Sequence, residues 1–145
     1  MKRIFTLLFI GALFFSCSDD DTNCCVPVPE CGKFPFTTND EVFAEIATDN
    51  YSITHVVLSG NCLDITIHSS GCDGNTWEES LFSVISFVEI DPHQKALKLK
   101  LINQELCLAI VEKTITFDLT LLQIEELNQI VFLLEGWDEP IIYLY

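Results

Sequence analysis

The sequence predicts an all-β protein, namely an antiparallel β-sandwich of Ig-like architecture with about seven or eight strands. Three observations lead to this fold class: short apolar runs that alternate with polar residues, turn-type sequences every 8–12 residues or so, and no regular alternation of strand and helix patterns. A small barrel is the alternative that the same pattern allows. The chain has 145 residues, of which 49% are apolar, so one domain with a buried core is expected.

The clearest hairpin lies in residues 51–69. Its two runs, 51–58 and 62–69, flank Ser59-Gly60-Asn61, which is typical of a tight turn. In the second run, three aliphatic residues alternate with polar ones: Leu63, Ile65 and Ile67. One face of this strand is therefore predicted to be buried.

Further strands are predicted by apolar or alternating runs in the rest of the chain: 81–90, 96–102, 105–117, 130–134 and 141–145. Segments of turn composition separate them: 70–75, 91–94, 103–104 and 135–140. One short helix is predicted near 121–128, because Thr120 and Gln123 fit a capping box and leucine and isoleucine recur behind them at helical spacing.

Residues 1–16 have the pattern of an export signal. Lys2 and Arg3 precede an apolar run from Ile4 to Phe15, and the small residue Ser16 comes directly before Cys17. Twelve apolar residues are too few to span a bilayer, which takes roughly 20, but they fit the hydrophobic part of a signal peptide.

The end of this segment, Phe14-Phe15-Ser16-Cys17, resembles a bacterial lipobox, with Phe14 where the usual motif has leucine. The next residues, Ser18-Asp19-Asp20-Asp21, are similar to the acidic stretch that follows the lipidated cysteine in surface-exposed lipoproteins of the Bacteroidota. The resemblance implies that Cys17 carries acyl chains such as palmitate and becomes the mature N-terminus. It also implies a protein held at the outer membrane, with its domain on the cell surface, and it says nothing about activity.

The remaining chain is divided by composition into a tether, 17–39, and a folded domain, 40–145. The tether is acidic at its start and contains Pro27, Pro29 and Pro35, which favour an extended backbone. An ordered arm attached through Cys24, Cys25 or Cys31 is the equally open alternative.

Six cysteines remain besides Cys17, an even number that indicates disulfides in an exported chain: Cys24, Cys25, Cys31, Cys62, Cys72 and Cys107. Cys72 and Cys107 are the predicted pair within the domain, because each falls at the end or edge of a predicted strand. If all six pair, at least one bridge must join the tether to the domain. No spacing fits a zinc or other metal site, and no cofactor is predicted.

The charge balance narrows the classes of partner. The formal charge is −15, and removal of Lys2 and Arg3 with the leader leaves five lysines against 22 acids, or −17. A nucleic-acid binder needs a basic surface, so nucleic acid is excluded as a partner. The remaining chain has no arginine, which counts against bidentate recognition of phosphate or carboxylate.

Two tryptophans, Trp77 and Trp137, lie in polar segments next to acids and are the candidate ligand-binding residues. If exposed, such rings would stack on neutral sugars; if not, they cover the ends of the core. No catalytic motif is present. The leading hypothesis is a lipid-anchored protein with a non-catalytic binding or structural role, acting on a surface protein or complex. The alternatives are a glycan-binding accessory protein that uses both tryptophans and, last, a hydrolase with paired carboxylates.

Overall fold

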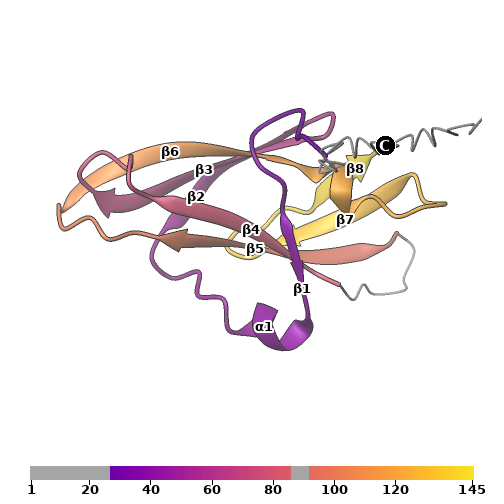
Figure 1. Ribbon diagram of the computed structural model, residues 1–145, viewed down its shortest axis with the longest axis horizontal. Helices are drawn as coiled ribbons and strands as arrows, with labels where there is room; N and C mark the ends of the chain where they lie inside the picture. The colour runs from indigo at the N-terminus through magenta and orange to yellow at the C-terminus, as the bar shows by residue number, and fades with distance from the viewer. Residues whose placement is uncertain (1–26, 86–91) are drawn as a thin grey trace, which may run out of the picture.

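The computed structural model describes residues 27–85 and 92–145, which form two β-sheets packed face to face (Figure 1). The predicted leader (1–16), Cys17, Cys24, Cys25 and the end of the predicted strand 81–90 lie outside the described residues. The elements, in chain order, are β1 (Phe36–Thr38), α1 (Asp40–Ala44), β2 (Ser52–Ser59), β3 (Cys62–Gly71), β4 (Glu78–Val84), β5 (Gln94–Ile102), β6 (Ala109–Asp118), the 3₁₀ turn η1 (Leu119–Leu122), β7 (Gln129–Leu134) and β8 (Ile141–Leu144). Among these residues, no helix is long and apolar enough to cross a membrane.

The prediction of an all-β fold with two sheets is confirmed. One sheet has the order β1-β4-β5-β7-β8, and the other has the order β2-β3-β6. The description as purely antiparallel is wrong for two pairs, because β1 runs parallel to β4 and β5 runs parallel to β7. Both exceptions arise where the chain leaves one sheet, forms strands of the other, and returns in the same direction.

The core lies between the sheets and is built from the alternate residues that the pattern predicted. Leu63, Ile65 and Ile67 of β3 are fully buried and meet the inward side chains of the other sheet, among them Leu97 and Leu99 of β5. The β2–β3 hairpin turns at Gly60 and Asn61, and Gly60 has a φ of 59°, which suits the first position of a two-residue hairpin turn.

The predicted helix near 121–128 is wrong. Only η1 forms there, and its side-chain cap is Asp118, whose carboxylate accepts from the Thr120 N–H at 2.9 Å. Leu119 and Leu122 are buried at a spacing of three residues, which a 3₁₀ turn satisfies. Gln123 is extended and Glu126 has a φ of 73°, so the backbone leaves helical geometry after Leu122.

The N-terminal arm is attached to the sandwich before residue 40. Cys31 forms a disulfide with Cys62 at the start of β3, and the Glu30 N–H donates to the Asp118 carboxylate at 2.7 Å. Lys33 pairs with β6 beside Phe117, and β1 then joins β4. The sheet thus begins at Phe36, four residues before the predicted domain boundary.

Candidate functional site

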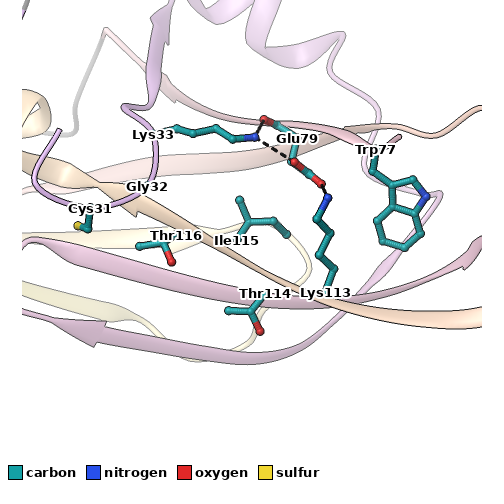
Figure 2. A pocket seen from close by; sticks show the side chains of 9 residues that line it. All are labelled: Cys31, Gly32, Lys33, Trp77, Glu79, Lys113, Thr114, Ile115 and Thr116. Carbon is teal, nitrogen blue, oxygen red and sulfur yellow. Dashed lines mark hydrogen bonds and ion pairs between the residues drawn. The ribbon is translucent and has the colours of Figure 1, made fainter. Parts of the chain in front are cut away.

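An open groove lies between β6 of one sheet and the start of β4 of the other (Figure 2). Its volume is about 610 Å³. The residues that line it come from the arm, from β4 and the residue before it, and from β6: Cys31, Gly32, Lys33, Trp77, Glu79, Lys113, Thr114, Ile115 and Thr116. The groove exists because β1 pairs with β4 only from Phe82 onward, which leaves the first half of β4 uncovered on that side by described strands.

A buried carboxylate forms the centre of the groove. The Glu79 side chain is only 4% exposed, and it forms ion pairs with Lys33 (Nζ to Oε2, 2.9 Å) and Lys113 (Nζ to Oε1, 2.5 Å). Lys33 Nζ also donates to the Glu79 carbonyl at 3.1 Å, so the Lys33 side chain reaches from the N-terminal arm to β4, as Figure 2 shows. Lys33 and Lys113 therefore meet at one carboxylate, which gives the cluster a formal charge of +1 in an acidic protein.

The pKa of Glu79 follows from these contacts. Burial alone would raise the pKa, but the hydrogen bonds and charges of Lys113 and Lys33 outweigh burial and hold the pKa of Glu79 below its ordinary value. The carboxylate therefore stays ionised at neutral pH.

The alternation of buried residues in β4 and β6 contains a signal for this cluster. Glu79 lies two residues before buried Leu81 on the same face of β4. Lys113 likewise shares a face of β6 with buried Ile115 and Phe117. Charged residues of opposite sign thus occupy core-facing positions in two strands. Residues at such positions need partners, so an ion pair between the strands is the physical consequence.

Trp77 closes one end of the groove, and of the two predicted alternatives, an exposed stacking ring or a ring that covers the end of the core, the structure shows the second. The side chain belongs to the core cluster, and the residue is 5% exposed. Gly71 and Gly74 pass directly over the ring, where an added Cβ would come within 3.0 and 3.4 Å of ring atoms. Lys113 Nζ lies 5.9 Å from the ring centroid, and the indole N–H has no hydrogen-bond partner among the described residues. Trp77 therefore forms a wall of the groove, with its ring packed into the core.

The loop over Trp77 is held by Glu105. Its Oε2 accepts from the backbone N–H groups of Cys72, Asp73 and Gly74, and its Oε1 accepts from the Thr76 hydroxyl. Desolvation would raise the pKa of Glu105, but these hydrogen bonds lower it to about 2. The predicted Cys72–Cys107 disulfide is present and attaches the same loop two residues beyond Glu105.

Trp137 lies elsewhere. It is half-buried against the core and lines a smaller cavity of about 250 Å³ together with Ile53, Gly136, Asp138 and Glu139. The two tryptophans thus line separate cavities, and the structure does not bring them together into one stacking surface.

Other candidates for chemistry are dispersed. His68 is paired with Glu112 at 2.6 Å on the outer face of the three-stranded sheet, and His55 lies opposite Thr66. Within residues 27–85 and 92–145, no group of His, Cys, Asp and Glu side chains is arranged to hold a metal ion. The groove thus offers ammonium groups, a carboxylate and an aromatic wall, which are means of binding.

Comparison with known proteins adds a fold relationship. No family model matches the chain, and no curated protein matches it. The fold is similar to that of a protein of unknown function, DUF1344, from Bacteroides vulgatus ATCC 8482, with a TM-score of 0.53 and 17% sequence identity. The similarity covers 79% of this chain and 56% of that protein, so the chain spans just over half of its length.

Proposed function

We propose that this chain is a lipid-anchored cell-surface protein of the outer membrane with a non-catalytic binding role, and that the groove between β4 and β6 is its binding site. The observation that carries the anchoring is the order of residues at the start of the chain, in which a basic pair, an apolar run and Ser16 precede Cys17. Two disulfides in the domain are consistent with an exported protein, since such bonds persist in oxidising compartments.

The groove supports the binding role through its composition. It combines two partly exposed ammonium groups, a buried carboxylate that fixes their positions, and the wall formed by Trp77. Binding sites typically combine a largely apolar lining with a few placed polar groups. A role in binding neutral glycans through both tryptophans is not favoured, since the ring of Trp77 is buried.

The anchoring is tested by metabolic labelling with radioactive palmitate in a bacterial host that processes lipoproteins. The wild-type chain is expected to take up label and to sediment with membranes. Cys17→Ala is expected to lose the label and to retain residues 1–16, because cleavage requires the lipidated cysteine. Cys25→Ala is the matched control and is expected to label normally. An unlabelled wild-type protein, or a labelled Cys17→Ala variant, contradicts the proposal.

A further inference from the structure

The outer edge of β6 carries backbone groups that no described strand uses. β6 is the last strand of its sheet, and only Lys33 pairs with its outer side among the described residues. There, the Lys33 N–H donates to the Thr116 carbonyl at 3.1 Å, and the Asp118 N–H donates to the Lys33 carbonyl at 2.9 Å. An extended segment of the chain itself thus already occupies the last part of this edge.

The pairing of Lys33 fixes which other groups face outward. Backbone groups of successive residues in a strand point to opposite edges, so Ile110, Glu112 and Thr114 present their N–H and C=O groups on the same side as Thr116 and Asp118. All three residues are exposed. The free edge therefore continues the line of Lys33 toward the start of β6.

Large apolar side chains are exposed along the approach to this edge. Leu106, Leu108 and Ile110 are 94%, 91% and 73% exposed. The Cys72–Cys107 disulfide and the hydrogen bonds of Glu105 hold this segment in place. Exposed apolar residues beside a strand edge that is left open by the described strands are the features of a surface that receives another strand.

We infer that β6 binds an extended segment of a partner polypeptide as an added strand, with one acidic side chain of the partner directed into the groove at Lys33 and Lys113. Side chains alternate between the two faces of a sheet, so every second residue of an added strand would point toward the groove that Lys113 and Ile115 line. Lys33 and Lys113 share one carboxylate, and a second carboxylate would complete the charge balance. The inference rests on the proposed binding role and names its partner class.

The probe is a phage-displayed library of random peptides of about 12 residues, selected on the purified domain. We expect enriched peptides that carry Asp or Glu at one fixed position, with β-branched or apolar residues at alternate positions and no proline between them. Amide exchange at Ile110, Glu112 and Thr114 is expected to slow on binding. No enrichment, or no change in exchange along β6, overturns the inference.

Edge-specific variants test the mode of binding. Thr114→Pro removes an outward N–H and keeps the inward bonds to β3, because proline is tolerated at an edge position whose N–H faces solvent. It is expected to weaken the selected peptides at least about tenfold, whereas Thr114→Val, which keeps the N–H, is expected to bind within about twofold of wild type. Equal affinity of the Thr114→Pro variant, with its circular dichroism spectrum unchanged, refutes strand addition.

A separate pair of lysine variants tests whether binding requires the positive charge in the groove. Lys113→Gln is expected to weaken binding about tenfold, and Lys100→Gln, an exposed lysine of β5, is expected to have no effect. Loss of affinity in both variants would indicate general charge attraction and overturn the assignment to the groove. A protein that instead forms dimers, which Thr114→Pro dissociates, would show that a second copy is the occupant and contradict the inference of a different partner. None of these outcomes depends on Cys17, so failure here leaves the proposed anchoring unaffected.

Discussion

Glu105 and Cys72 are connected twice. The Glu105 carboxylate accepts the Cys72 N–H, and the Cys72 sulfur is bonded to Cys107, two residues after Glu105. A carboxylate that receives three backbone N–H groups occupies a concave anion site formed by the loop. The covalent and the electrostatic connection therefore hold the same loop over Trp77.

The low pKa of Glu105 predicts a pH dependence of stability. Its folded pKa of about 2 is lower than the ordinary value of 4.5, so the contribution of the carboxylate is present above pH 4.5 and is lost as the pH falls toward 2. Glu105→Gln is expected to lower the free energy of unfolding at pH 7, and the difference from wild type should vanish near pH 2. Urea denaturation across this pH range measures it. Glu125→Gln, an exposed acid, is the control, and a constant difference for Glu105→Gln would contradict the prediction.

Removal of the Glu79 carboxylate is expected to lower the free energy of unfolding. The size of the loss depends on how deeply its two lysine partners are buried. Glu79→Ala leaves Lys113 facing the core edge without a counter-charge, yet Lys33 and Lys113 keep 52% and 32% of their side chains exposed. The expected loss is therefore about 1–3 kcal/mol, below the loss from breaking a fully buried pair. Glu78→Ala, the exposed neighbour, should change stability by less than about 0.5 kcal/mol. Equal effects of the two substitutions would contradict the buried ion-pair arrangement.

Substitution of the two tryptophans by alanine is expected to destabilise the protein to different extents. Trp77→Ala removes a buried ring from the core and should cost about 3–5 kcal/mol. Trp137→Ala removes a half-buried ring and should cost less than half of that. Thermal denaturation followed by circular dichroism separates the two variants. A Trp77→Ala variant as stable as Trp137→Ala would show that Trp77 is exposed in solution.

Removal of the Cys72–Cys107 disulfide is expected to destabilise the domain. The bridge joins residues 35 apart, and closing a loop of this length contributes about 3–4 kcal/mol by restricting the unfolded chain. The Cys72→Ala/Cys107→Ala variant should therefore unfold at lower urea concentration than wild type. Peptide mapping without reduction should find the Cys31–Cys62 and Cys72–Cys107 linkages. A different pairing would contradict the structure.

The strands with buried alternate residues were predictable, whereas β1, which has no buried residue and falls in the predicted tether, was not. Alternation in β3 and β5 placed Leu63 and Leu99 in the core, and Gly60-Asn61 located the hairpin turn. Parallel pairing of β5 with β7 was not predictable, since alternation within a strand contains no information about which strand lies next to it. The helix prediction is wrong because Leu121, Ile124 and Leu127, although at helical spacing, do not form a buried face; Leu119 and Leu122 are the residues that are buried.

The candidate site was harder to predict. Trp77 was identified as a candidate residue, but its polar neighbours left both an exposed and a buried ring open. Gly71 and Gly74 cover the ring only once the loop has folded back over it. Lys33, Glu79 and Lys113 come from three separate segments, and only their tertiary arrangement makes them one cluster. The disulfide between Cys72 and Cys107 was predicted because strand ends on neighbouring loops meet.

The two described disulfides lie at opposite ends of β3, with Cys62 as its first residue and Cys72 directly after its last. If the chain is held at a bilayer through Cys17, as proposed, a pulling force on the N-terminal arm would thus enter the sandwich at Cys62. The arm cannot be peeled from β6 while the Cys31–Cys62 bond is intact. The load passes instead to β3, which is hydrogen-bonded on both sides, to β2 and to β6. The arm is thus covalently joined to the central strand of the three-stranded sheet.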